Sequence, residues 1–168
     1  MSVVVRRLRP DEALPFRELR LRALADAPAA FGSTHAEERT RPLAFWMDRT
    51  HQSSTSADSA IFVAEVGEAW VGLAGGYRED PDDAAIQLVS MWVAPDGRRL
   101  GTGKLLVDAV LDWSRSVGAT RVDLWVTRSN DPAYELYRSF GFEPDGAYQP
   151  LPSDPCKEEV RMGLRLES

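Results

Sequence analysis

The sequence of 168 residues predicts a single α/β domain in which short strands alternate with helices. Stretches with the alternating apolar pattern of strands are interleaved with segments whose apolar residues recur every three to four positions, as in helices. No internal repeat or change of composition marks a second domain, and a chain of this length normally forms one. Residues 1–168 are therefore expected to form one domain.

The N-terminal half is expected to begin with a strand and a helix, the helix having apolar positions at Leu14, Leu21 and Leu24. Pro28 and Gly32 then break the chain. Gly67-Glu68 is typical of a hairpin turn. In order, the expected elements are a strand at 3–8, a helix at 11–25, a weaker helix from about 36 that includes 43–47, a loop at 51–59, and strands at 61–66 and 70–77.

The C-terminal half changes period twice. A helix is indicated where Leu106, Val110, Trp113 and Val117 share one face, and Gly118 supplies its stop. In order, the expected elements are a strand at 84–93, a helix at 102–117, a strand at 121–126, a helix from about 130 to 140 with Pro132 in its first turn, and strands at 142–148 and 159–166 separated by a proline-rich loop at 150–155.

The composition argues against several functional classes. The formal net charge is −6, whereas a nucleic-acid-binding protein usually carries a basic surface. One cysteine, Cys156, excludes an internal disulfide. No apolar stretch has the length of a signal peptide core or a membrane span. We therefore expect a cytoplasmic protein without nucleic-acid or membrane partners.

The segment with the strongest chemical signal is the turn Arg98-Arg99-Leu100-Gly101-Thr102-Gly103-Lys104, between an expected strand and an expected helix. Glycines allow a tight turn and close approach of a ligand to the backbone. The first N–H groups of a helix lack internal partners and lie at the positive end of its dipole, so they bind phosphate readily. A plain strand-to-helix connection is the alternative interpretation.

Two nucleotide-binding motifs are excluded by the residues of this turn. A P-loop that ends in Gly103-Lys104 requires glycine at position 98 and serine or threonine at 105, where the sequence has Arg98 and Leu105. A dinucleotide-binding fingerprint requires glycine at the position of Leu106. A cradle for the pyrophosphate of another kind of ligand remains.

Two motifs in this half resemble those of the GNAT superfamily of N-acetyltransferases. Arg98-x-x-Gly101-x-Gly103 matches the family's (Gln/Arg)-x-x-Gly-x-(Gly/Ala) motif, and residues 90–95 resemble its fourth strand. Residues 130–142, NDPAYELYRSFGF, resemble its Asn-x-x-Ala-x-x-Leu-Tyr-x-x-x-Gly-Phe motif. The two motifs occur in the family's order and on the expected elements, so the resemblance over residues 84–142 is specific.

The resemblance implies a mixed, mostly antiparallel sheet of six to seven strands, flanked by about four helices, with the fourth and fifth strands splayed. In the family, acetyl-CoA lies in that gap. The implied activity is transfer of an acetyl group from acetyl-CoA to a primary amine of a small molecule or a protein, by direct attack in a ternary complex and without a metal. A non-catalytic acyl-CoA-binding module is the alternative. A homodimer is expected from the family alone.

The resemblance also assigns roles to residues. The backbone N–H of Met91 is expected to point at the thioester carbonyl, where a fixed donor can contribute about 2.7–4 kcal/mol. Val93 is expected to pair with the pantetheine amides, and Tyr137 to protonate the departing thiolate. The residues expected to bind acetyl-CoA are Met91, Trp92, Val93, Arg98, Arg99, Leu100, Gly101, Thr102, Gly103, Lys104, Asn130 and Tyr137.

Each of these assignments has a structural alternative. Met91, Trp92 and Tyr137 could be ordinary core residues, and Asn130 could be a simple helix cap. Only the backbone of Met91 is needed for its role, so packing and function are compatible there. Asn130 could likewise serve both purposes.

The general base is left unassigned by the sequence. An alkylamine has a pKa of about 10.4 and is almost wholly protonated at pH 7, so a base is useful. Relatives often carry a glutamate on the fourth or fifth strand, where this chain has Val89, Ser90 and Trp125. A water chain to a carboxylate such as Glu37, Glu38 or Glu79 is one route, although solvent exposure is the commoner state of such acids. His35 and His51, expected in loop-like surroundings, and one cysteine do not indicate a metal site or a Cys/His nucleophile.

Overall fold

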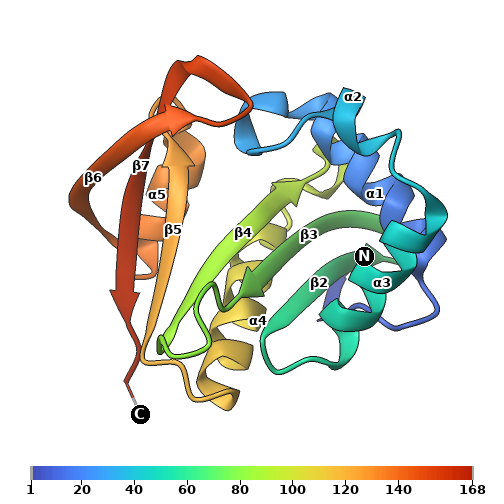
Figure 1. The fold of residues 1–168 in the computed structure, drawn as a ribbon, viewed down its shortest axis with the longest axis horizontal. Helices are drawn as coiled ribbons and strands as arrows, with labels where there is room; N and C mark the ends of the chain where they lie inside the picture. Colours follow the sequence, from blue (N-terminus) through green and yellow to red (C-terminus); the bar gives the residue numbers. More distant parts are fainter. Residues whose placement is uncertain (1, 168) are drawn as a thin grey trace.

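The computed structural model describes residues 2–167 as a seven-stranded sheet with helices on both faces (Figure 1). The strands lie in the order β1-β2-β3-β4-β5-β7-β6, and every neighbouring pair is antiparallel except β4 and β5. Their bounds are β1 Val3–Arg7, β2 Ser59–Val66, β3 Ala69–Tyr77, β4 Ala85–Val93, β5 Arg121–Thr127, β6 Glu143–Leu151 and β7 Asp154–Arg165.

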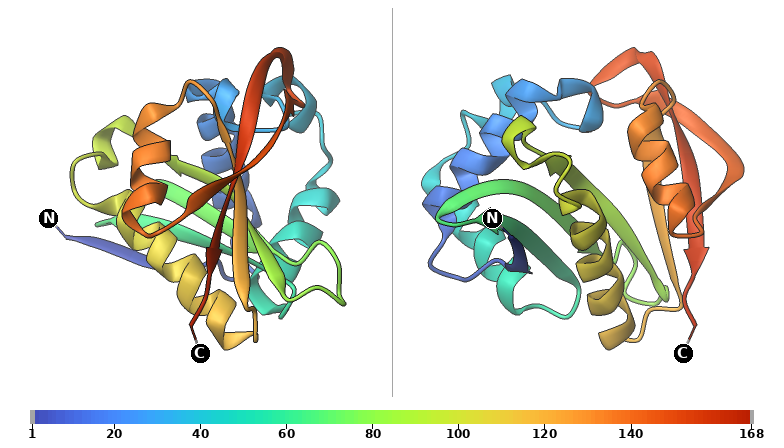
Figure 2. Two further views of the ribbon diagram at one scale, coloured as in Figure 1. Left: turned by 90° about the vertical axis from the view of Figure 1, so that its left-hand side faces the viewer. Right: turned by 180° about the vertical axis from the view of Figure 1, so that it is seen from behind.

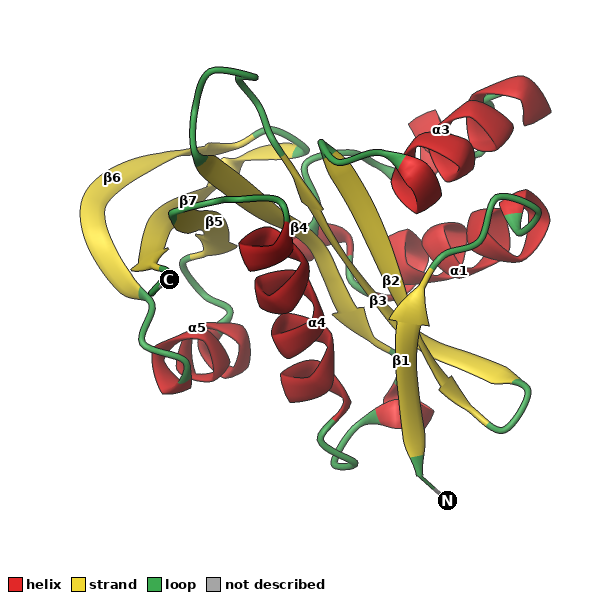
Figure 3. Ribbon diagram, turned by 90° about the horizontal axis from the view of Figure 1, so that it is seen from below, coloured by secondary structure: helices red, strands yellow, loops and turns green. Residues whose placement is uncertain are grey.

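The helices are divided between the two faces of the sheet (Figures 2 and 3). One face carries α1 (Ala13–Asp26), the single turn α2 (His35–Glu38) and α3 (Leu43–Thr55), and the other carries α4 (Thr102–Ser116) and α5 (Asp131–Ser139). Two short 3₁₀ turns, η1 (Pro28–Ala30) and η2 (Pro95–Gly97), follow α1 and β4. The predicted mixed, mostly antiparallel sheet and its flanking helices are confirmed.

The strands β4 and β5 separate along their length. Their parallel pairing runs from Ala85↔Arg121 to Leu88↔Leu124 and includes no later residue. Figure 1 shows the two strands together where both begin and apart where both end. The predicted splay is therefore present, and the edges of β4 after Leu88 and of β5 after Leu124 face a gap.

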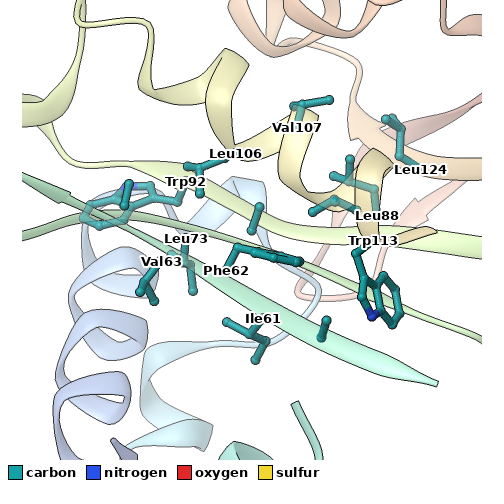
Figure 4. Packing of buried hydrophobic residues seen from close by; sticks show 14 of the residues in the cluster. Ile61, Phe62, Val63, Leu73, Leu88, Trp92, Leu106, Val107, Trp113 and Leu124 are labelled. Carbon is teal, nitrogen blue, oxygen red and sulfur yellow. The ribbon is translucent and has the colours of Figure 1, made fainter. Parts of the chain in front are cut away.

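The core extends over both faces of the sheet, and one part of it lies between α4 and the sheet. Leu106, Val107 and Trp113 of α4 form one apolar cluster with Leu73 of β3 and Leu88 of β4 (Figure 4). Full burial of one such side chain contributes about 1.5–3 kcal/mol, so this face fixes α4 on the sheet. The helix predicted at 102–117 is confirmed. Packing of α4 on the sheet also places the start of the helix at the glycine-rich turn.

The predicted apolar face of α1 is partly wrong. Leu14 is exposed and Leu21 only half-buried, whereas Phe16, Leu19 and Ala23 are buried. The ring of Phe16 packs edge-on against Trp46 of α3, with centroids 5.7 Å apart. Contact between the two helices, which the leucine spacing does not encode, determines which side of α1 turns inward.

Residues 51–59 were expected to form a loop, but α3 continues to Thr55. The hydroxyl of Thr55 donates to the carbonyl oxygen of His51 at 2.8 Å, and Thr50 and Ser53 are buried on the face that packs against β2. Arg7 of β1 donates to the carbonyl of Ser53 at 3.0 Å. These tertiary contacts outweigh the low helix propensity of the serines and threonines.

The proline-rich loop expected at 150–155 is a tight hairpin instead. Leu151 of β6 pairs with Asp154 of β7, so only two residues connect the strands. The strand β6 tolerates prolines because it lies at the edge of the sheet, where a missing N–H breaks no ladder. None of the helices within residues 2–167 is long and apolar enough to cross a membrane.

Candidate active site

The gap between β4 and β5 contains a narrow cleft, here called the β4–β5 cleft. It is closed on one side by η1 and on another by α5, and it encloses about 50 Å³. Thr127 at the end of β5 donates to the carbonyl oxygen of Ala29 at 2.6 Å and so fixes η1 there. The lining residues are Ala30, Leu88, Val89, Ser90, Met91, Trp125, Val126, Thr127, Asn130, Ala133 and Tyr137.

The strand β4 carries a bulge at the mouth of the cleft. Ser90 has a φ of 59°, and neither Ser90 nor Met91 has a register partner on β3 or β5. Arg20 of α1 donates to the Ser90 hydroxyl at 2.8 Å, which holds the bulge from the other face. A bulge reorients backbone groups out of the ladder, and the predicted N–H donor at Met91 belongs to this segment.

The glycine-rich turn leads directly into α4, the helix expected after it. Gly101 is the N-cap of α4 with a φ of 76°, and no atom lies within 4 Å of the position that a Cβ would take. The turn is therefore open to a ligand above the first N–H groups of α4. A Cβ on Gly103, in contrast, would lie 3.2 Å from both Leu136 and Met91, so α4 meets α5 and β4 closely there.

The basic residues of the turn are not equivalent. Arg98 donates to the carbonyl oxygen of Val93 at 3.1 Å and to Asp26 at 3.1 Å, so its side chain is engaged within the fold. Asp26 also accepts from the Trp92 indole at 2.9 Å. Arg99 and Lys104 are exposed and have no ion pair within residues 2–167. These two supply the free positive charge at the start of α4.

Asn130, the N-cap of α5, and Tyr137 within α5 both line the cleft. The Asn130 side chain accepts from the N–H of Ala133 at 3.3 Å, which confirms the helix-cap interpretation. Tyr137 is buried and packs edge-on against Phe142, with centroids 5.9 Å apart. Burial raises the pKa of the Tyr137 phenol, and no hydrogen bond to residues 2–167 contributes. The phenol is thus held neutral, with its proton available to donate.

The model of the acetyltransferase (GNAT) family matches residues 20–142, well over half of the chain. This chain belongs to the GNAT family. The match covers the bulged strand β4, the glycine-rich turn and α5, so the family resemblance recognised from the two motifs is confirmed.

Known proteins similar to this GNAT chain agree in sequence or in fold. N-acetyltransferase 8B of Rattus norvegicus is 34% identical over 106 residues, which are 61% of this chain and 48% of that protein. This chain thus spans about half the length of that relative. A GNAT acetyltransferase from Streptococcus pneumoniae has a TM-score of 0.80 at 16% identity, covering 99% of this chain and 100% of the other. Spermidine N-acetyltransferase from Vibrio cholerae, in complex with CoA and spermine, has a TM-score of 0.76 at 15% identity, covering 98% and 95%.

The GNAT fold of this chain has a second cavity on the α1–α3 face, next to the cleft. It encloses about 380 Å³ and shares Ala30, Leu88, Val89, Ser90 and Trp125 with the cleft. Its remaining lining residues are Arg20, Phe31, Gly32, Ser33, Arg49, Tyr77 and Glu159. The two hollows therefore meet midway along β4, at residues 88–90, where the bulge begins.

Glu159 is a site candidate that the sequence analysis missed. Its side chain is buried on β7 and accepts from the Gln149 amide at 2.6 Å. Burial raises the pKa of the Glu159 carboxyl, and the Gln149 hydrogen bond opposes this only in part. No sequence motif marks it; the one available signal was an acidic residue at an inward position of a closing strand.

The three glutamates considered as the general base from the sequence do not take this position. Glu38 is buried, not solvated, and accepts from Arg20 at 3.0 and 2.9 Å. Burial alone would raise the pKa of Glu38, but these hydrogen bonds outweigh it and lower the pKa. Glu37 and Glu79 are exposed and do not line the second cavity.

The histidines also differ from expectation, because His35 lies in α2 and His51 in α3 rather than in loops. Within residues 2–167 no group of three or more His, Cys, Asp or Glu side chains could hold a metal ion. Neither histidine lines the cleft or the second cavity.

Proposed function

We propose that this chain is an N-acetyltransferase that moves the acetyl group of acetyl-CoA to a primary amine. The observation that carries the proposal is the junction of two hollows at the bulge of β4. One hollow has the features of a cofactor cleft, and the other is a polar cavity with a buried carboxylate. A reaction between two bound substrates requires this kind of shared boundary.

The residues at the cleft fit acetyl-CoA. The open backbone at Gly101 and the free charges of Arg99 and Lys104 suit a pyrophosphate at the start of α4. The β4 edge at 89–93 is unpaired toward β5 and can accept an extended amide-containing arm. Leu100, Thr102 and Gly103 would contribute backbone contacts. The Thr102 hydroxyl is already used, since it donates to the carbonyl of Gly97 at 2.7 Å.

The proposed mechanism assigns one task to each of three residues. Acetyl-CoA supplies an acetyl thioester, whose C–S bond breaks as a C–N bond to the amine forms. The N–H of Met91 donates to the carbonyl oxygen, where negative charge develops. Glu159 accepts the proton that the amine loses. Tyr137 donates a hydrogen bond to the sulfur and, because a phenol is a weaker acid than a thiol, stabilises the thiolate more than it protonates it.

Direct transfer is favoured over a covalent enzyme intermediate. Cys156 is the sole cysteine of the sequence; it is exposed on β7 and lines neither hollow. The Cys156→Ser variant is expected to keep full activity, and initial-rate kinetics should give intersecting rather than parallel lines. Parallel lines together with loss of activity in the variant would refute direct transfer.

Acetyl-CoA is the ligand expected from the family, and measuring the shift in melting temperature with acetyl-CoA, ATP and NAD tests this expectation. We expect stabilisation by acetyl-CoA and none by the other two. Free thiol release with a panel of primary amines then separates an enzyme from a non-catalytic acyl-CoA-binding module. Stabilisation by acetyl-CoA without thiol release for any amine would favour a non-catalytic acyl-CoA-binding module. The buried carboxylate of Glu159 beside the cleft argues against such a module.

A further inference from the structure

The second cavity contains two charged groups that the fold leaves without full partners. The first is Arg49 of α3. Its guanidinium lies 3.6 Å from Glu38 Oε1, beyond hydrogen-bond distance, and makes no hydrogen bond to residues 2–167. Its side chain is 29% exposed, and Phe16 lies under it at 5.5 Å.

The charge around Arg49 does not balance. Arg20 and Glu38 form a two-pronged pair with distances of 3.0 and 2.9 Å, which uses both oxygens of that carboxylate. One carboxylate therefore faces two guanidinium groups. Burial, and after it the neighbouring charge of Arg20, lowers the pKa of Arg49 to about 10. A guanidinium in this position gains from an added anion, since it carries five donors suited to a carboxylate.

The second group is Glu159. Within residues 2–167 its carboxylate is bound by the Gln149 amide and by no cation. A buried carboxylate without a positive partner is costly, so a bound ammonium group is favoured beside it. Arg49 and Glu159 line the same cavity of about 380 Å³, which also contains the Ser90 bulge where the cleft begins.

We propose that the acceptor of this chain is an amino acid-like compound, whose amine is held at Glu159 and whose carboxylate is held by Arg49. The inference rests on the proposed acetyl transfer and names its acceptor class. A polyamine fits less well, because its second ammonium group would lie toward the Arg49 guanidinium and be repelled by it. A simple alkylamine offers no anion to the Arg49 guanidinium, which makes no hydrogen bond to residues 2–167.

The experiment compares amino acids with their amides, which have the same shape but no carboxylate. Free thiol release is measured with acetyl-CoA and with glycine, β-alanine, 4-aminobutanoate, leucine and phenylalanine, each beside its amide. We expect kcat/KM for at least one acid to exceed that of its amide by about tenfold or more, which corresponds to about 1.4 kcal/mol. Spermidine is expected to be a poorer substrate than that acid.

Variants of Arg49 test where this preference originates. Arg49→Gln should bring the acid-to-amide ratio close to one, mainly through KM, and Arg49→Lys should restore part of it because the positive charge returns. Arg115→Gln is the control, since Arg115 is an exposed residue of α4 whose ion pair, with Asp112 at 3.2 Å, lies on the surface. Calorimetric titration of the CoA-bound protein with the preferred acid gives a second readout that does not depend on turnover.

The outcomes are distinguishable. Turnover of amines with no preference for any acid over its amide overturns this inference and leaves the proposed transfer intact. An acid preference that survives in Arg49→Gln also overturns it, because the carboxylate would then bind elsewhere. If acetyl-CoA neither stabilises the protein nor releases thiol with any amine, the proposed function itself fails, and this inference fails with it.

Discussion

Glu159 on β7 lies directly opposite Thr127 on β5 in the antiparallel register of the two strands. Thr127 lines the β4–β5 cleft and Glu159 lines the second cavity. One pair of facing residues therefore spans both hollows. This relationship places a carboxylate next to the site of proposed acetyl transfer without any glutamate on β4 or β5.

Replacing Glu159 by glutamine should lower kcat/KM by about 10²–10⁴, the usual contribution of general acid–base catalysis. Glutamine keeps the size of the side chain but cannot accept the proton of the amine. The matched control is Glu158→Gln, since Glu158 is exposed and pairs on the surface with Arg128 at 3.0 Å. An equal loss in both variants, or none in Glu159→Gln, would remove Glu159 from the mechanism.

The pH profile gives an independent test of the same residue. Glu159 must be ionised to act as a base, and burial raises its pKa above the ordinary glutamate range. Activity should therefore fall as the pH falls through that raised value, and this acid limb should be absent from Glu159→Gln. The effect of pH on stability has the opposite direction: ionisation of Glu159 supports activity but lowers the stability of the fold. Above that pKa the ionised buried group costs free energy, so Glu159→Gln should be at least as stable as the parent at pH 8, with the difference vanishing at acid pH.

Glu159 could not be predicted from the sequence for a physical reason. The glycine-rich turn and α5 with its cap Asn130 depend on residues that are close together in the sequence, so their motifs can be recognised there. Glu159 reaches the site only through pairing of β5 with β7, about thirty residues apart. The Arg20–Glu38 pair is another example, since it depends on packing of α1 against α2.

The helices show the same division. The extent of α4 follows from its own apolar spacing and from a glycine stop at Gly118. The last turns of α3 depend instead on Arg7 and β2, and the sequence of this segment has loop composition. Among the helices, α4 is stabilised from within and was predicted closely, whereas the end of α3 is stabilised by distant partners and was not.

The Gly101→Glu variant should lose most of its affinity for CoA, measured by calorimetry. The new side chain would occupy the open space above α4, and its charge would repel a phosphate. The backbone strain of a φ of 76° costs about 1–2 kcal/mol for a non-glycine residue. Gly118→Glu is the matched control, because Gly118 has a φ of 80° and equally open surroundings at the far end of α4. Undiminished affinity in Gly101→Glu would move the phosphate site elsewhere.

The oligomeric state stays a prediction from the family. Light scattering at micromolar concentration should give twice the chain mass of 18.7 kDa. A single-chain mass would contradict the expected homodimer. It would leave the site unaffected, because the cleft and the second cavity are both lined within one chain.

Tyr137 offers the sharpest separation of catalysis from packing. Its ring packs on Phe142, but no hydrogen bond of its hydroxyl to residues 2–167 stabilises the fold. The Tyr137→Phe variant should therefore change the free energy of unfolding by less than about 1 kcal/mol, below the usual effect of a lost hydrogen bond. The rate of acetyl transfer should fall by about 10²–10⁴, while acetyl-CoA affinity changes little, because the hydroxyl acts as charge develops on sulfur.

The control for this variant is Tyr134→Phe, one turn earlier on α5, where the tyrosine lines a different hollow with Tyr148 and Val160. Melting curves, calorimetry with acetyl-CoA and a rate with any accepted amine are needed for both variants. A Tyr137→Phe protein that keeps its rate assigns Tyr137 to the core alone. A fall in rate of the same size in Tyr134→Phe would point to a general disturbance of α5. Only a selective loss at Tyr137, with binding and melting preserved, supports a hydrogen bond to the departing sulfur.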